Sequence, residues 1–247
     1  MKLAIDIGNT STNVGLFDNH DVVKKNHFSS INEFKPFLDT LKSYNIESAI
    51  ISSVVPELTN EYKDLLIDTY QYPTFVINYK LSNLSLQVAQ PETVGADRLC
   101  NIFAVKKDYN TPAIIVDFGT ATTYDVINHE GIFIGGAIAT GIETSAEYLI
   151  DKAALLSKTN LVFPDSVIGI DTVTNIQSGV MFGAVGQVEG MIHRIQEETG
   201  TNYSIFLTGG FSKLIAPQLN IPHTIDTDLT LKGMIYIYDL IRNYIYC

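Results

Sequence analysis

Two segments of this chain share one pattern, in which an apolar run ends in Asp-x-Gly and small hydroxyl residues follow. The first copy covers residues 3–10, and the second covers residues 114–122. A second apolar segment follows each copy, at residues 13–17 and 123–127, and this order predicts a hairpin. Two related hairpins, one near the start of each half, predict two related domains that face each other across a cleft.

Glycine turns of this kind can bind phosphate, because their backbone N–H groups are open and a nearby carboxylate can hold a neutralising cation. One Asp-x-Gly turn alone is more often structural, since Asp and Gly are ordinary turn residues. The chain adds a third apolar strand that ends in Thr208-Gly209-Gly210, where paired glycines let a ring or a sugar approach the backbone. Together, the three turns predict a nucleotide cleft.

The balance of charge restricts the partners of the chain. Its 247 residues include 27 acidic and 16 basic side chains, a net charge of −11. Nucleic acid and anionic membranes bind basic faces, so neither is an expected partner. Two cysteines, Cys100 and Cys247, give no disulfide framework, and the first strand leaves no room for a signal peptide, so we expect a cytoplasmic protein. Cys100 lies in an apolar run and is expected to be buried.

Strand and helix patterns alternate along the chain, which predicts an α/β fold. The early hairpins require mixed rather than parallel sheets. A polar stretch from Lys106 to Pro112 predicts a boundary between domains of residues 1–110 and 111–247. Helices are predicted near residues 31–43, 57–70, 98–105, 143–156, 173–198 (as one or two helices) and 229–244.

The ordered motifs resemble those of type III pantothenate kinases, in the superfamily of actin, sugar kinases and heat-shock chaperones. The resemblance covers nearly the whole chain and rests on these blocks: Asp6-Ile7-Gly8-Asn9-Thr10, Ser53-Val54-Val55-Pro56, Gly95-Ala96-Asp97-Arg98, Asp117-Phe118-Gly119-Thr120-Ala121, Gly135-Gly136-Ala137-Ile138, Asp171-Thr172-Val173 and Thr208-Gly209-Gly210. It implies two ribonuclease-H-like domains with mixed sheets flanked by helices and an ATP cleft between them. It also implies ATP-dependent phosphorylation of pantothenate, the first step of coenzyme A synthesis.

The resemblance assigns the nucleotide side of the site. The ATP-binding residues would be Thr120 of the second hairpin and the whole first turn, namely Asp6, Ile7, Gly8, Asn9, Thr10, Ser11, Thr12 and Asn13. Asp6 would lie near magnesium, through water, because magnesium binds few carboxylates and keeps several waters. Asp117 would hold part of a site for a monovalent cation, potassium or ammonium. Turn capping is the alternative role for Asn9, Thr10 and Thr120, and it can coexist with binding.

The acceptor side would be formed by Gly95, Ala96, Asp97 and Arg98. A primary hydroxyl is a poor nucleophile, and a carboxylate within hydrogen-bond reach can accept its proton. The resemblance implies that Asp97 is this base, whereas the residues alone favour a helix-capping aspartate. Arg98 offers a fork of donors for the carboxylate of pantothenate. Thr172 matches a substrate contact that reaches the site across a homodimer interface.

The sequence alone does not decide whether the protein forms a homodimer, because four spaced glycines suit a close interface and intramolecular packing equally. They lie at Gly179, Gly183, Gly186 and Gly190 of the long predicted helix.

The chain departs from the family pattern at three positions. Thr140 stands where proline is usual, Val88 where an aromatic residue is frequent, and Asp171 where asparagine is common. Val88 puts one substrate-wall contact in doubt, and Thr140 is expected to loosen a turn at most. Two alternatives stay open: a non-catalytic regulator that retains the fold, and a kinase of another small hydroxyl substrate such as a sugar. The retained block at residues 95–98 argues against both.

Overall fold

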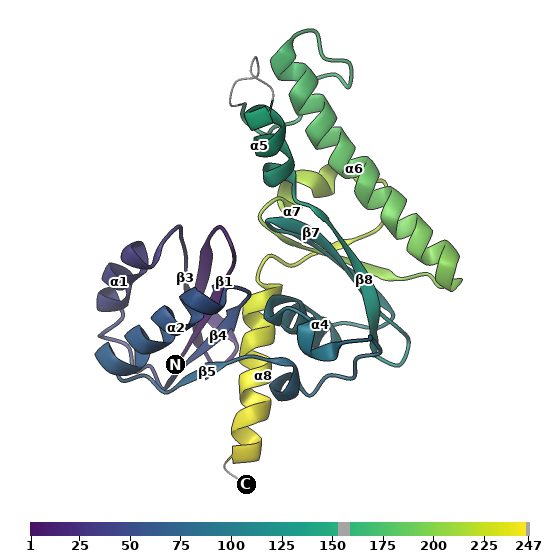
Figure 1. Cartoon of the computed structure of the whole chain (residues 1–247). Helices are drawn as coiled ribbons and strands as arrows, with labels where there is room; N and C mark the ends of the chain where they lie inside the picture. Colours follow the sequence, from purple (N-terminus) through teal and green to yellow (C-terminus); the bar gives the residue numbers. More distant parts are fainter. Residues whose placement is uncertain (153–158, 246–247) are drawn as a thin grey trace. The chain divides into compact units, whose positions relative to one another are not determined.

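The computed structural model describes residues 1–152 and 159–245, so that Cys247 and the end of the helix predicted at 143–156 lie outside the described part. The chain divides into two compact units (Figure 1). Unit 1 is Met1–Tyr109 together with Asp228–Cys247, and unit 2 is Asn110–Thr227. Each unit is built on one five-stranded sheet that mixes parallel and antiparallel strands.

The sheet of unit 1 has the strand order β3-β2-β1-β4-β5. Its strands are β1 (Lys2–Ile7), β2 (Thr12–Asp18), β3 (Asp21–Phe28), β4 (Ser48–Ser53) and β5 (Thr74–Val76). β1 pairs antiparallel with β2 and parallel with β4, and β4 pairs parallel with β5. The carboxyl ends of β1, β4 and β5 therefore meet at one edge of the sheet, which is where open α/β sheets place ligands.

The sheet of unit 2 repeats this plan in the order β10-β9-β6-β7-β8. Its strands are β6 (Ala113–Phe118), β7 (Ala121–Ile127), β8 (Phe133–Thr140), β9 (Ser204–Gly209) and β10 (Thr224–Ile225). β6 pairs antiparallel with β7 and parallel with β9, as β1 does with β2 and β4. The prediction of two related hairpins in mixed sheets is thereby confirmed.

Helices cover both faces of the unit 1 sheet (Figure 1). Side chains alternate along β1, so that Leu3 and Ile5 pack with α1 (Ile31–Thr40) and α2 (Pro56–Asp64). Ala4 faces the other way, toward α4 (Ala96–Asp108) and α8 (Leu229–Ile245). The remaining helical pieces of this unit are a π-helical turn at Leu65–Thr69, α3 (Tyr79–Ser82) and a 3₁₀ turn at Pro91–Thr93.

Helices α4 and α8 approach each other closely at Gly233. A Cβ atom at this position would lie 2.0 Å from the carbonyl oxygen of Cys100. Because α8 packs on β1 and α4, it belongs to unit 1, whereas the sequence prediction assigned all of residues 111–247 to the second domain. The division into domains of residues 1–110 and 111–247 stays a prediction.

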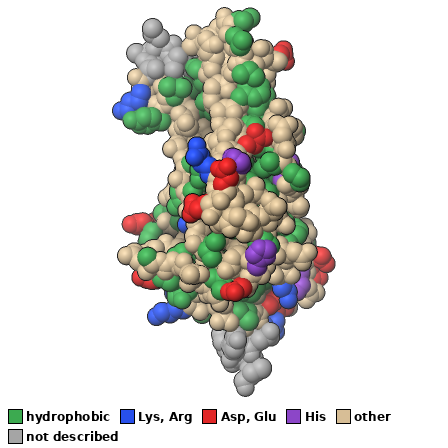
Figure 2. All heavy atoms as spheres, turned by 90° about the vertical axis from the view of Figure 1, so that its right-hand side faces the viewer, with side chains coloured by type: hydrophobic (Ala, Val, Ile, Leu, Met, Phe, Trp, Pro, Cys, Tyr) green, Lys and Arg blue, Asp and Glu red, His purple; other side chains and the backbone are tan. Residues whose placement is uncertain are grey.

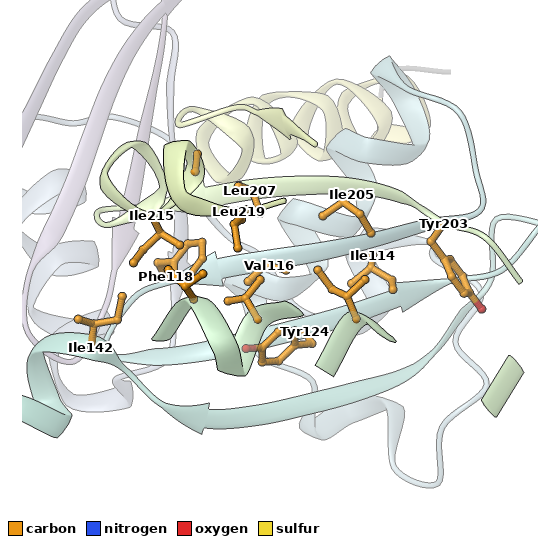
Figure 3. Packing of buried hydrophobic residues seen from close by; sticks show 14 of the residues in the cluster. Ile114, Val116, Phe118, Tyr124, Ile142, Tyr203, Ile205, Leu207, Ile215 and Leu219 are labelled. Carbon is orange, nitrogen blue, oxygen red and sulfur yellow. The ribbon is translucent and has the colours of Figure 1, made fainter. Parts of the chain in front are cut away.

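The core of unit 2 lies between its sheet and one long helix (Figure 3). Ile114, Val116 and Phe118 of β6 point with Tyr124 and Leu207 into this core. The helix is α6 (Thr172–Thr199), which is continuous, and α5 (Ile142–Lys152), α7 (Ser212–Ile215) and a 3₁₀ turn at Ala216–Gln218 complete the unit. Within the described residues, no helix has the length and apolar character needed to span a membrane.

Candidate functional site

The first hairpin places a carboxylate at the carboxyl end of β1. Asp6 is half-buried there and pairs with Ser52 of β4 in the parallel ladder, where Ser52 Oγ donates a hydrogen bond of 2.9 Å to Asp6 Oδ1. The turn that follows is tight, since the N–H of Gly8 donates to the carbonyl of Ser11 at 2.9 Å. Asp6, the aspartate predicted to lie near magnesium, is thus held at the edge where the carboxyl ends of β1, β4 and β5 meet.

The predicted ATP-binding stretch 6–13 is exposed only in part. Asn9 and Thr10 are exposed at the tip of the turn, while Ile7 packs in the core. Thr12 is also buried, with its Oγ1 atom 3.0 Å from the hydroxyl of Tyr62. The side chains of Ile7 and Thr12 are therefore structural, and these two residues can offer a ligand only their backbone.

The second hairpin places Asp117 in the same position of its own sheet. Gly209 at the end of β9 has a φ of 84°, and a Cβ there would lie 2.5 Å from Asp117 Oδ1. Thr120 is exposed, and its carbonyl accepts hydrogen bonds from Gly141 N–H and from Thr144 Oγ1 at 2.8 Å. Position 209, beside Asp117, requires a glycine for two reasons. Its φ is positive, and it has no room for a side chain.

Asp97 lies in the first turn of α4, but it is not the N-cap of that helix. The N-cap is Gly95, which forms no side-chain cap bond. Asp97 Oδ1 accepts a 2.8 Å hydrogen bond from the N–H of Arg98, and a Cβ on Gly95 would lie 2.5 Å from the same oxygen. Desolvation raises the pKa of Asp97, while the N–H and the charge of Arg98 oppose the rise. A raised carboxyl pKa favours proton acceptance near neutral pH.

A cavity of about 330 Å³ lies beside Asp97 in unit 1. Its lining includes Gly95 and Ala96 of the predicted acceptor block, together with Val54 after β4 and Tyr79 after β5. Its volume is near the lower end of the range for small-molecule sites. Asp97 is not part of this lining, but its carboxyl lies close to Gly95, which is.

Two side chains of this region were missed by the sequence prediction. Cys100 is fully buried, as expected, and it lies one helical turn after Asp97, while Ser52 is the residue that holds Asp6. Burial raises the pKa of the Cys100 thiol well above its usual range, and the charges of Asp6 and Asp97 add to the rise. No sequence signal separates Ser52 from the other serines of residues 48–53.

Thr172 lies in unit 2, at the first turn of α6. It is exposed and lines a cavity of about 480 Å³ between α5 and α6, along with Thr140. Asp171 caps α6 by accepting the N–H of Thr174 at 2.8 Å, and the Thr174 hydrogen bonds lower the pKa of Asp171. Asn and Asp are equally good N-caps, which explains why the departure at this position is harmless to the helix. Thr140 lies within β8, paired with Ala121.

Among the described residues, nothing packs close to the Cα atoms of the four α6 glycines on the side where a side chain would lie. A Cβ atom added to any of them would meet nothing within 4 Å, at Gly179, Gly183, Gly186 and Gly190. Of the two roles that the sequence left open for these glycines, the described residues therefore do not support intramolecular packing. Large apolar side chains are exposed in the same unit, with Ile168 at 80% and Ile170 at 93% exposure. Figure 2 shows hydrophobic side chains along the upper part of the face it draws, where α6 lies.

The described residues contain no group of three or more His, Cys, Asp and Glu side chains arranged to hold a metal ion. Of the carboxylates that the sequence singled out, Asp6 and Asp97 belong to unit 1, and Asp117 belongs to unit 2. A single carboxylate suits magnesium, which completes its octahedron with waters and substrate phosphates.

Comparison with known proteins gives a consistent result. A family model described as type III pantothenate kinase matches residues 2–194. The type III pantothenate kinase of Moorella thermoacetica is 38% identical over 251 residues, which cover 97% of this chain and 99% of that protein. The enzyme of the same name from Roseiflexus sp. is 38% identical over 255 residues, covering 98% of this chain and all of the relative.

Solved structures share the fold at lower identity. The activator of 2-hydroxyisocaproyl-CoA dehydratase from Clostridium difficile, with bound ADPNP, matches with a TM-score of 0.59 and 13% identity, over 98% of this chain and 96% of that one. A Listeria monocytogenes protein named as an N-acetylmannosamine kinase matches with a TM-score of 0.53 and 13% identity, over 98% and 99%. These likenesses support the predicted sugar-kinase-like fold.

Proposed function

Because this chain belongs to the type III pantothenate kinase family and uses ATP to phosphorylate pantothenate, we propose that Asp97 is the base of that reaction. The single observation that carries the assignment is the desolvated carboxyl of Asp97, which lies close to Gly95, a residue of the cavity lining. The regulator and the sugar kinase were the alternatives, and the family match favours pantothenate kinase over both.

The reaction requires positioning more than covalent chemistry. The acceptor hydroxyl must lie in line with the transferred phosphoryl group and lose its proton as the new bond forms. Oδ1 of Asp97 is engaged by the N–H of Arg98, so Oδ2 is the atom that we assign to the proton. The neighbouring Arg98 guanidinium binds the carboxylate of pantothenate in this proposal, and Gly95 and Ala96 allow the substrate close to the backbone.

The turn at residues 8–11 binds the ATP phosphates, with Thr120 as a further ATP contact. The tight turn closed by the Gly8 N–H and the exposure of Asn9 and Thr10 support this role. Asp6 would hold magnesium through water. Its half-buried carboxylate is a hard oxygen ligand at the carboxyl ends of β1 and β4, and such a ligand fits this ion. When bound, magnesium neutralises phosphate charge.

Asp117 contributes to a site for a monovalent cation, potassium or ammonium. The absence of a side chain at Gly209 supports the fit, because a Cβ there would lie 2.5 Å from Asp117 Oδ1 and 2.6 Å from the Phe118 carbonyl oxygen. Carboxylate and carbonyl oxygens are suitable ligands for such a cation, which would supply positive charge near the nucleotide.

The protein acts as a homodimer through the α6 face of unit 2, and Thr172 contacts the substrate of the partner subunit. Two observations support this part of the proposal. The α6 glycines leave open space, and exposed apolar side chains such as Ile168 and Ile170 lie in the segment before the helix. Exposed apolar patches of this kind mark interaction surfaces. The cytoplasm is the proposed location.

An activity assay tests the assignment of the base. Purified protein with ATP, magnesium, potassium and pantothenate should form 4'-phosphopantothenate, detected by mass spectrometry, and a sugar panel should give no product. Asp97→Asn should lower kcat by roughly 10²–10⁴-fold, the range for loss of a general base, with little change in ATP binding. Asp64→Asn, an exposed change on α2, is the matched control. A wild-type kcat for Asp97→Asn would rule out this base.

A further inference from the structure

A buried serine of β4 holds the carboxylate of Asp6 inside unit 1. Ser52 Oγ donates a hydrogen bond of 2.9 Å to Asp6 Oδ1, and Cys100 of α4 is buried in the same unit. Cys100 and Ser52 are both fully buried, at 0% exposure. Asp6 and Ser52 are direct neighbours in the β1–β4 ladder, so their side chains leave the same face of the sheet.

The chemistry of the two groups fixes the direction of this hydrogen bond. An ionised carboxylate only accepts, so the single hydroxyl proton of Ser52 goes to Asp6.

We propose that Ser52 is a positioning residue for the nucleotide side of the reaction. Ser52 holds Oδ1 of Asp6 and so fixes the orientation of this carboxylate at the carboxyl end of β1. The inference rests on the proposed role of Asp6 at magnesium and the ATP phosphates. It assigns a function to a residue outside that set.

Ser48 provides a comparison within the same strand. It lies four residues before Ser52, so both side chains leave β4 on the same face, and it is 1% exposed. Its hydroxyl has no hydrogen-bond partner among the described residues. The two buried serines therefore differ in their hydrogen bonds, which makes Ser48 a matched control. A buried hydroxyl without a partner costs stability.

Steady-state kinetics on the full-length protein tests the proposal. The Ser52→Ala variant should raise the KM for MgATP and the magnesium concentration at half-maximal rate by roughly tenfold, because a hydrogen bond to a charged group is worth about that factor. The KM for pantothenate should stay the same. The Ser48→Ala variant should keep all three values. A merely structural role of Ser52 would change thermal stability without this selective change in MgATP.

An Asp6→Asn variant separates this inference from the function on which it rests. If Asp6→Asn weakens the response to magnesium while Ser52→Ala behaves like Ser48→Ala, the positioning role is wrong and Asp6 keeps its proposed role. If Asp6→Asn has the magnesium response of the wild type, the role of Asp6 itself fails. A misfolded Ser52→Ala sample, recognised by its melting curve, is replaced by Ser52→Cys, which retains a donor and should fall between the wild type and Asp6→Asn.

Discussion

The close approach of α8 to α4 makes Gly233→Ala the most informative single substitution in unit 1. The new Cβ would lie 2.0 Å from the carbonyl oxygen of Cys100, 2.5 Å from its carbonyl carbon and 2.9 Å from its Cα. All three atoms belong to the backbone, so no side-chain rotation relieves the clash. Restoring an ordinary contact of 3.4 Å to the oxygen requires the helices to separate by roughly 1.4 Å.

Two opposing terms set the size of the effect. Alanine in a helix gains about 0.5–1 kcal/mol over glycine, whereas overpacking a well-packed interface costs about 1–3 kcal/mol and sometimes more. We expect a net loss of about 1–2 kcal/mol, which for a protein of this size lowers Tm by roughly 5 °C. Activity should fall further, because α4 carries Asp97 in its first turn and a misplacement of about 1 Å can cost 10²-fold in rate.

Melting curves and kcat are measured for Gly233→Ala and for Asp64→Asn as the control. Asp64 is an exposed residue of α2, so its substitution should leave Tm and kcat nearly unchanged. If Gly233→Ala melts at or above the wild-type temperature with wild-type kcat, the α4–α8 contact is not the constraint described above.

The remaining predictions concern charge and assembly. The pKa of Asp97 is raised by folding, so its ionisation costs stability as pH rises from the ordinary carboxyl range through the folded pKa. Calorimetry should therefore show Asp97→Asn more stable than the wild type at neutral pH and equal to it in acid; a less stable variant at pH 7 would contradict the desolvation. The pKa of Asp171 is lowered, so its cap stabilises above the unfolded pKa and is lost as pH falls through the folded one. Asp171→Ala should lower Tm at neutral pH but not at acid pH, and Asp171→Asn should leave it unchanged. Ile170→Lys should shift the protein from dimer to monomer in analytical ultracentrifugation, and an unchanged mass would remove the α6 face as the interface.

Local patterns explain why much of the fold could be predicted. The β1–β2 and β6–β7 hairpins are specified by residues close in sequence, and so is the mixed character of the two sheets. The sequence could not decide whether residues 173–198 form one helix or two, because glycines also break helices. The cap at Asp171 and the left-handed Gly200 fix its two ends in the structure.

Packing between segments far apart in the chain could not be predicted from the sequence. The apolar spacing of residues 229–244 predicts a helix, but the spacing is the same whichever sheet the helix covers, and it covers β1 of the first unit. The close approach of the Asp97 carboxyl to Gly95 depends on the fold around them, not on local propensity. The bond between Ser52 and Asp6 depends on a ladder that joins strands 46 residues apart.

The two-segment build of unit 1 orders the events of synthesis. Unit 2 is continuous from Asn110 to Thr227, so a chain that leaves the ribosome amino end first can complete it before α8 exists. Until then, the apolar face formed by Ala4, Phe17 and Ile50 has no α8 to cover it. A nascent chain paused within unit 2 would present that face to chaperones, although its first strand was among the earliest segments made.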